Sequence, residues 1–213
     1  MLSLLKNRTL LLSLSCLSFI ALTITPAQAK TPIYKIEVIV FESMALKGWT
    51  EEFWPSDLEL PVTKGSHSLT EKGKSPLWFN NQKNDLNAEV AKLNKKGYRV
   101  LFHQAWSQMA YDNKNAPTTL IENNQAHGSN LLGTVRLYRT RFAHVNFDLE
   151  FERRIPGKIL DAFMKNQKIG LNEVAPTHWR FNLKESRKIK YGELHYIDHP
   201  LFGVLVQVEQ LNQ

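Results

Sequence analysis

Residues 134–152 read TVRLYRTRFAHVNFDLEFE and contain two strand patterns in succession. In the second pattern every other residue is apolar, at Val145, Phe147, Leu149 and Phe151. The residues between them are polar, and this alternation is typical of an antiparallel strand with one face on the core and the other in water. We therefore expect an antiparallel sheet with one open face.

Further strand patterns lie on both sides of this pair. Residues 33–41, IYKIEVIVF, are β-branched and aromatic, with apolar residues on both parities from Val38 onward. This composition favours an inner strand near the sheet centre, covered on both faces. Residues 98–106 form a strand pattern, an alternating strand begins at Trp179, and residues 202–210, FGVLVQVEQ, form the last one.

One helix is well defined by its pattern. Asn84 or Asp85 can cap its N-terminus, and the helix is expected to run to Lys96. Gly97 follows as a C-terminal stop. One face of this helix is apolar at spacings of four and three, at Leu86, Val90 and Leu93.

Two long connections, residues 42–83 and 153–177, interrupt these elements. Proline, glycine and aromatic residues in the first suggest that it packs partly on the body of the protein. A short helix over residues 158–164 is expected in the second connection, and residues 108–130 have a polar, loop-like composition.

These elements together predict the fold class. The sequence favours an α+β domain with a mostly antiparallel sheet of about six strands, one well-defined helix and two long connections. A second helix just before the last strand would give the element order of a ferredoxin-like core, although that core has fewer strands.

The first 29 residues have the three zones of an export signal. A basic start and an apolar run precede small residues at Ala27 and Ala29. The apolar run is shorter than the roughly 20 residues of a transmembrane helix. We therefore expect residues 1–29 to be a cleaved signal peptide and residues 30–213 to fold as one domain outside the cytoplasm, without a membrane span.

Cleavage would also change the chemistry of the chain. Cys16 is the only cysteine, so no thiol would remain. The formal charge of the whole chain is +7, and removal of Lys6 and Arg8 lowers it by two. This modest positive charge after export does not indicate a nucleic-acid partner. With no thiol and neither a G-x-S-x-G nor an S-x-x-K motif in the mature chain, we predict no enzyme and no catalytic residue.

Three carboxylates share one face of a predicted strand, at Asp148, Glu150 and Glu152. Successive members of this row would be about 6.6 Å apart. A pair of carboxylates can catalyse glycoside hydrolysis, but a row on one strand is more typical of a face exposed to water or to a basic neighbour.

Two histidines lie four residues apart, His195 and His199, with Asp198 beside them. On a helix this spacing would suit a metal ion. Pro200 disfavours helical geometry at His199, so we expect a hydrogen-bonded turn leading into the last strand, with no metal and no cofactor.

The cations form two groups. One strand carries Arg136, Arg139 and Arg141, and a later segment carries Arg187, Lys188 and Lys190. Guanidinium groups hold carboxylates in a bidentate grip, and flat rings that suit sugars lie on neighbouring strands at Tyr98, Trp106 and Tyr138. Peptidoglycan carries both carboxylates and sugar rings. The alternative is that these cations pair with nearby acids on a solvated sheet face, at Glu150, Glu152 and Glu185.

Four segments together resemble the CsiV family of periplasmic proteins of gammaproteobacteria. These segments are YKIEVIVFE (34–42), YRVLFHQAW (98–106), GTVRLYRTRFAHVNFDLEF (133–151) and ESRKIKYGELHYIDHPLFGVLVQV (185–208). The resemblance implies a periplasmic peptidoglycan-binding protein that supports cell-wall synthesis and cell shape without catalysis. A wall-synthesis enzyme or its activator is a further expected partner.

The resemblance supplies no ligand residues, so the expected binding residues follow from side-chain chemistry alone. They are Arg139, Arg141, Arg187, Lys190, His195 and His199. The competing hypothesis is a structural or regulatory envelope factor that does not bind glycan. Such a factor would contact other proteins through the exposed sheet and the segment around Trp49 and Trp54.

Overall fold

The computed structural model describes residues 32–69, 79–109, 111–125, 128–170 and 172–211. The chain divides into two units, Met1–Lys30 and Thr31–Gln213, and every described residue lies in the second. The predicted signal peptide, with Cys16, lies outside the described residues. No helix in the described ranges has the length and apolar character needed to cross a membrane.

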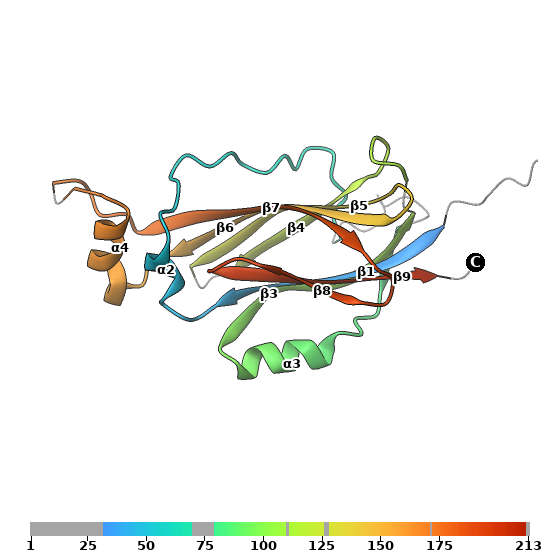
Figure 1. Ribbon diagram of the computed structural model, residues 1–213, viewed down its shortest axis with the longest axis horizontal. Helices are drawn as coiled ribbons and strands as arrows, with labels where there is room; N and C mark the ends of the chain where they lie inside the picture. The colour runs from blue at the N-terminus through green and yellow to red at the C-terminus, as the bar shows by residue number, and fades with distance from the viewer. Residues whose placement is uncertain (1–31, 70–78, 110, 126–127, 171, 212–213) are drawn as a thin grey trace, which may run out of the picture. The chain divides into compact units, whose positions relative to one another are not determined.

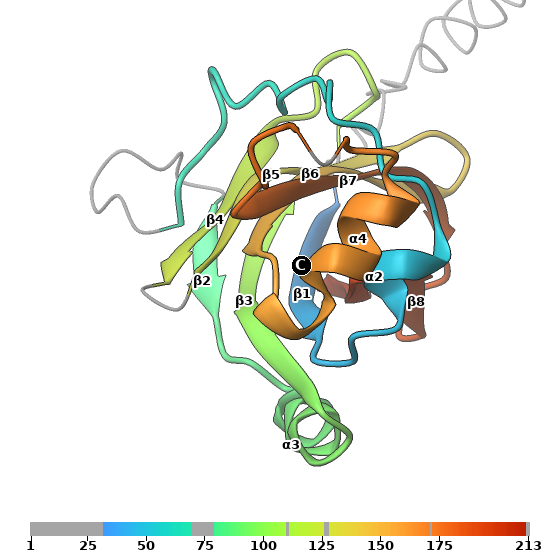
Figure 2. The same cartoon turned by 90° about the vertical axis from the view of Figure 1, so that its left-hand side faces the viewer.

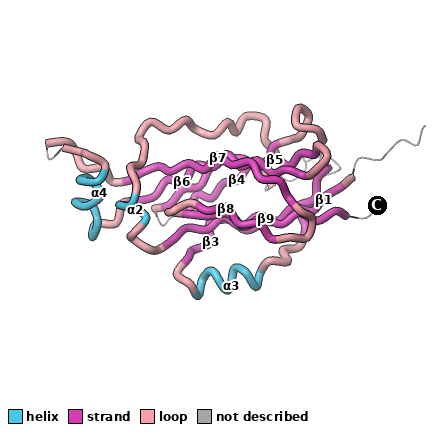
Figure 3. Tube along the Cα trace, in the orientation of Figure 1, coloured by secondary structure: helices cyan, strands magenta, loops and turns pink. Residues whose placement is uncertain are grey.

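Nine strands in the described residues form two antiparallel sheets (Figures 1 and 3). The first sheet has the order β2 (Asn80–Gln82), β3 (Tyr98–Met109), β1 (Ile33–Ser43), β9 (Phe202–Leu211) and β8 (Leu194–Asp198). The second has the order β4 (Thr118–Gln125), β5 (Ser129–Arg139), β6 (Ala143–Arg154) and β7 (His178–Ile189). The two sheets face each other as a sandwich.

The helical segments are short and lie outside the two sheets. Helices α2 (Gly48–Glu51) and α4 (Leu160–Asn166) lie together at one end, with the 3-10 turn η1 (Gly157–Ile159) leading into α4 (Figures 1 and 2). Helix α3 (Asn87–Lys95) lies on the outer face of the first sheet (Figure 1). Within the described residues, the outer face of the second sheet carries no helix.

The core fills the space between the sheets. The alternating residues of β6 that are quoted above, from Val145 to Phe151, are all buried. They belong to one apolar cluster with side chains of the facing sheet, including Val204, Val206 and Val208 of β9. Burial of each such side chain contributes about 1.5–3 kcal/mol.

The structure confirms the central position of β1 and the mostly antiparallel pairing. Strand β1 pairs with both β3 and β9, and its residues are buried on both faces. The count of six strands is wrong, and the ferredoxin-like core is not confirmed, because nine strands divide between two facing sheets.

Three strands lie in segments without a clear strand pattern. Strand β4 lies within residues 108–130, whose polar composition predicted a loop. Its sequence TTLIENNQ can nevertheless form a strand, because it pairs with β5 mainly through the backbone. Strand β2 has only three residues. Strand β8 replaces the turn expected around His195 and also occupies the place of a second helix before the last strand. Of the two long connections, the second contains its expected short helix, α4.

Helix α3 matches its predicted apolar face. Leu86, Val90 and Leu93 pack against Ile39 and Phe41 on the outer side of β1. Gly97 follows the helix with a φ of 80°, a conformation that glycine adopts without strain. The predicted cap is wrong, since neither Asn84 nor Asp85 caps α3 with its side chain.

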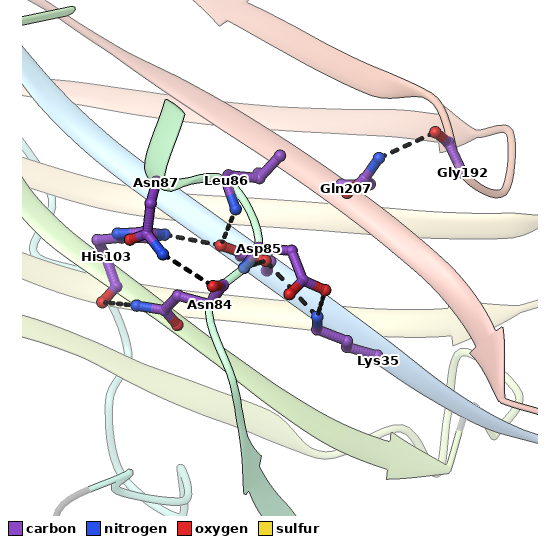
Figure 4. A network of polar contacts seen from close by, with 9 residues as sticks. Lys35, Asn84, Asp85, Leu86, Asn87, His103, Gly192 and Gln207 are labelled. Carbon is purple, nitrogen blue, oxygen red and sulfur yellow. Dashed lines mark hydrogen bonds and ion pairs between the residues drawn. The ribbon is translucent and has the colours of Figure 1, made fainter. Parts of the chain in front are cut away.

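A buried carboxylate takes the place of that cap. Glu37 of β1 is 1% exposed and accepts hydrogen bonds from the backbone N–H groups of Asp85 and Leu86, both at 2.9 Å. Its Oε1 also lies 2.7 Å from Nε2 of His103, and Lys35 pairs with Asp85 beside it (Figure 4). Negative charge at a helix N-terminus is favourable, so Glu37 fixes α3 to the sheet.

Replacing Glu37 with glutamine is expected to lower the free energy of unfolding by about 1–2 kcal/mol. In glutamine an amide –NH₂ group replaces one carboxylate oxygen. This group cannot accept a hydrogen bond from the donors that surround Glu37. Urea denaturation followed by circular dichroism measures the change. The matched control is Glu89→Gln, because among the described residues Glu89 pairs with Lys92 alone, on the surface of α3. This substitution should cost less than about 0.5 kcal/mol. Equal stability losses in the two variants would contradict the anchoring role.

Candidate functional site

Five of the six predicted site residues gather at one end of the sandwich. Arg139 is the last residue of β5, and Arg141 lies in the turn before β6. Arg187 lies near the end of β7, and Lys190 directly follows that strand. The backbone N–H of Lys190 donates to Nε2 of His195, at 3.2 Å, which connects the start of β8 to the same region.

Strand register brings these distant segments together. Arg139 is opposite Ala143 of β6, and Ala143 is opposite Ile189 of β7. Because adjacent strands are about 4.8 Å apart, the ends of β5 and β7 are about 10 Å apart across β6. The same register brings in one more cation, Lys188, which is opposite His144. We call this surface the basic end, formed by Arg139, Arg141, Arg187, Lys188 and Lys190.

The basic end has more cations than acids. Arg187 lies 3.7 Å from Glu185, and Lys190 lies 2.8 Å from Glu193. The other three cations are exposed and have no carboxylate within 4 Å among the described residues: Arg139, Arg141 and Lys188. Nearby acids therefore pair with two of the five cations, Arg187 and Lys190, and the other three leave a surplus of positive charge.

Aromatic rings lie directly beside this surplus. Nζ of Lys188 is 3.3 Å from the centre of the Phe142 ring, and Cζ of Arg141 is 5.5 Å from it. Phe142 is nevertheless 43% exposed. Next to it, the rings of Tyr138 and His144 are stacked with their centres 5.0 Å apart. The basic end thus combines cations with accessible ring surface, as cation–π geometry allows.

A groove on the outer face of the second sheet extends from the basic end. It has a volume of about 490 Å³, and we call it the outer groove. One wall is the connection that crosses over this sheet in Figure 1, which contributes Val62 and Lys64. Hydrogen bonds between the backbones of His67 and the edge strand β4 hold this connection in place, at 2.8 Å each.

The floor of the outer groove consists of cross-strand rows. Arg136, Asn146 and Ser186 form one row, which is next to the row that contains Tyr138, His144 and Lys188. The following row contains Thr134, Asp148 and Lys184. All members of the Arg136 row and of the Thr134 row line the groove. The groove floor therefore continues directly into the Tyr138 row, which carries ring surface of the basic end.

Three oxygen atoms along β6 are buried and accept no hydrogen bond among the described residues. They are Oδ1 of Asn146, Oδ1 of Asp148 and Oε2 of Glu150. Asp148 lies 4.0 Å from Lys184, and Glu150 lies 3.6 Å from Arg180. Burial raises the pKa of Glu150, against the opposing effect of Arg180. Such oxygens suit a ligand that donates hydrogen bonds, such as a hydroxyl or an amide.

The sixth predicted residue, His199, lies elsewhere. It follows β8 at the opposite end of the sandwich, and its ring packs against Trp54, Phe181 and Phe202 with centres 4.5–6.1 Å away. Its Nδ1 accepts a hydrogen bond from the backbone of Leu201 at 3.2 Å. Burial lowers the pKa of His199 to about 4. The ring is therefore neutral near pH 7 and belongs to an aromatic cluster.

His195 and His199 are also far apart. The chain between them is extended, and four residues of a strand span about 13 Å. One metal ion cannot be bound by both side chains at that separation. No group of three potential metal ligands occurs in the described parts of the chain.

Several aromatic side chains that were predicted to contact a sugar or a protein partner pack against other parts of the protein in the structure. Trp106 is fully buried in the sandwich, and Tyr98 of β3 packs edge-on against Phe41 of the neighbouring strand β1 in the first sheet. Trp49 and Trp54, expected to contact protein partners, are 0% and 7% exposed. The ring surface available beside the cations thus includes Tyr138, Phe142 and His144.

Sequence reasoning did not select Phe142, His144 or Asn146. Each lies in the alternating segment around residues 142–146, on the parity opposite the apolar residues or in the turn. That polar parity was visible in the sequence. What the sequence did not give was the strand register that places these residues beside Lys188 and the outer groove.

Comparison with known proteins adds one finding. The model of the family described as "Peptidoglycan-binding protein, CsiV" matches residues 9–211 of the chain. No curated protein and no solved structure matches the chain.

Proposed function

Because the chain belongs to the CsiV family of peptidoglycan-binding proteins, we propose that it binds peptidoglycan through the basic end and the outer groove. The observation that carries this proposal is the surplus of exposed cations beside Phe142 and the stacked Tyr138 and His144 rings. The protein acts in the periplasm, where it supports cell-wall synthesis and cell shape by binding and without catalysis.

The chemistry of the two surfaces fits the two parts of peptidoglycan. Carboxylates of the acidic peptides pair with Arg139, Arg141 and Lys188, since charge-assisted hydrogen bonds are the stronger kind. Sugar rings lie against the exposed ring of Phe142. Sugar hydroxyls donate to the Oδ1 atoms of Asn146 and Asp148, which accept no hydrogen bond from the described residues.

A wall-synthesis enzyme or its activator is a proposed second partner. Binding to the wall would bring such a protein close to its substrate and raise its effective concentration there. An envelope factor that binds only other proteins is the alternative function, and it predicts no binding to purified peptidoglycan.

The triple variant Arg139→Gln, Arg141→Gln, Lys188→Gln tests the proposal. It is expected to bind insoluble peptidoglycan about tenfold more weakly, because three exposed charge contacts of about 0.5 kcal/mol each are lost. Co-sedimentation at increasing protein concentration measures the affinity. Wild-type binding should also weaken as salt is raised, since ions screen exposed charges.

The control has the same loss of charge at a different place: Lys95→Gln, Lys96→Gln and Lys165→Gln, all exposed on or beside α3 and α4. It should bind like the wild type. Wild-type protein that stays in the supernatant at low salt would overturn the proposed function. Equal weakening in both triple variants would overturn only the choice of surface. In cells that lack the protein, the basic-end variant should restore shape less well than the control.

A further inference from the structure

A second cavity, of about 570 Å³, lies at the other end of the sandwich. It is lined by Arg99, Arg153 and Arg154, and we call it the arginine pocket. Strand β6 begins at the basic end and finishes at this pocket, so the two sites are about 35 Å apart along the strand. Figure 2 faces this end, with α2 and α4 toward the viewer.

Two of the three guanidinium groups are held by a buried carboxylate. Glu42 is 0% exposed and pairs with Nε of Arg99 and, at 3.1 Å, with Nε of Arg153. Nη2 of Arg99 donates to Ser129 at 3.1 Å, and Nη1 of Arg153 donates to the carbonyl of Ser43 at 2.7 Å. These contacts fix both groups in place before any ligand arrives.

Positive charge remains in excess. Glu42 is the one carboxylate within 4 Å of Arg99 or Arg153 among the described residues, and Arg154 has none there. Over the same residues, Nη1 of Arg99 and the whole Arg154 guanidinium donate no hydrogen bond. Burial is the main cause that lowers the pKa of Arg153, and Arg99 lowers it further against the effect of Glu42. An added anion would therefore be stabilised here.

Apart from Ser129 and Thr177, the rest of the pocket lining consists of apolar residues and glycine. Its lining includes Met44, Ile155, Pro156, Leu160, Ala175 and Pro176. An inorganic anion would make no use of these side chains. A short peptide with small apolar side chains and a free carboxylate would use both parts of the lining.

We propose that the arginine pocket binds the free carboxylate of a short peptide with small apolar side chains, through Arg99 and Arg154. Planar guanidinium groups match the geometry of a carboxylate. The identification of this ligand as a peptide of the cell wall rests on the proposed function, whereas the carboxylate pocket itself does not. Such a second contact would let one molecule hold the peptide and the glycan at different sites.

Isothermal titration calorimetry of the purified protein with N-acetyl-D-alanyl-D-alanine tests the pocket. The matched probe is the same dipeptide with a C-terminal amide, which differs only in its charge. We expect the acid to bind at least about tenfold more tightly than the amide, because a charge-assisted hydrogen bond to a carboxylate contributes a difference in affinity of this size. Inorganic phosphate serves as the third probe and should bind more weakly than the acid.

Arg154→Gln is the variant of choice, because Arg154 does not contact the buried Glu42. It should weaken binding of the acid about tenfold and leave binding of the amide unchanged. The control is Arg180→Gln, an arginine on the outer face of β7 whose side chain is 36% exposed, which should bind the acid like the wild type. Arg154→Lys keeps the positive charge but lacks the planar guanidinium group. Its affinity for the acid should lie between that of Arg154→Gln and that of the wild type.

Equal affinity for the acid and the amide would overturn the proposal, as would an Arg154→Gln variant that binds the acid like the wild type. Phosphate that binds as tightly as the acid would overturn the assignment to a peptide. The basic-end triple variant separates the two sites: it should bind peptidoglycan about tenfold more weakly and keep its affinity for the dipeptide acid. If wild-type protein fails to sediment with peptidoglycan but binds the acid, the proposed function fails and the pocket stands.

Discussion

The Glu42→Gln variant is expected to unfold with a free energy about 3–5 kcal/mol smaller than that of the wild type. Glu42 is fully buried near the end of β1, where it pairs with Arg99 of β3 and Arg153 of β6. Glutamine has nearly the same size but no charge. The two guanidinium groups would stay close together without a counter-charge, and an uncompensated buried charge is costly.

Glu42 also joins the two sheets. It belongs to the first sheet, whereas Arg153 and Ser129 belong to the second, and Ser129 donates to Oε2 of Glu42 at 3.3 Å. The guanidinium of Arg153 lies 5.7 Å from the centre of the Trp49 ring. Loss of Glu42 should therefore loosen the sandwich at this end and change the fluorescence of the buried Trp49.

Urea denaturation followed by tryptophan fluorescence measures this loss. The matched control is Glu185→Gln, whose side chain is 42% exposed and pairs with Arg187 on the surface. An exposed pair contributes about 0–1 kcal/mol, so the control should remain close to the wild type. A Glu42→Gln variant whose stability is within about 1 kcal/mol of the wild type would show that this network does not hold the sheets together.

Local patterns in the sequence were sufficient for some elements. Alternation with period two identified β6, and an apolar run on both parities identified β1 as a central strand. Helix α3 was visible from Leu86, Val90 and Leu93 together with Gly97. In each case the residues that determine the element are within a short segment, so no knowledge of partners was needed.

The division into two sheets depends on pairings between distant segments. Strand β1 pairs with β9, so that Ile33 is opposite Leu211 at the other end of the described chain. Nothing in either segment specifies the other. Strand β4 was missed for a related reason, because an edge strand needs only a backbone to pair with and Ile121 is its one fully buried apolar side chain.

The candidate site was predictable where one strand links its parts. Cations on β5 and β7 come together because β6 pairs with both. His199, also predicted as a binding residue, lies away from these cations, since its environment is set by Trp54, Phe181 and Phe202 from three separate segments. The arginine pocket had one sign in the sequence: Arg153 continues the apolar parity of Phe151 and so points inward, where a charge needs a partner.

Acid is expected to destabilise the protein through His199. Burial among aromatic rings lowers its pKa to about 4, compared with an ordinary value of about 6.5. Between these two values the unfolded chain binds a proton that the folded protein does not. The stabilising contribution is therefore complete above about pH 6.5 and is lost as the pH falls toward 4. The expected loss between pH 7 and pH 4.5 is about 2–3 kcal/mol.

The His199→Asn variant isolates this contribution from that of the carboxylates, which also titrate in acid. The Oδ1 atom of asparagine can accept the hydrogen bond that Leu201 donates to Nδ1 of His199, but asparagine takes up no proton. The variant should be less stable than the wild type at pH 7, because the aromatic cluster loses ring contacts. Its further loss between pH 7 and pH 4.5 should be smaller than that of the wild type by about 2 kcal/mol.

Urea denaturation at both pH values gives the two differences, with His195→Asn as the control. His195 lies at the other end of β8, next to Lys190, and its replacement leaves the buried ring of His199 in place. The control should therefore keep the full acid sensitivity of the wild type. If His199→Asn loses as much stability in acid as the wild type does, the buried ring is not the group that takes up the proton. The acid sensitivity must then come from the carboxylates, because their protonation is unaffected by the substitution.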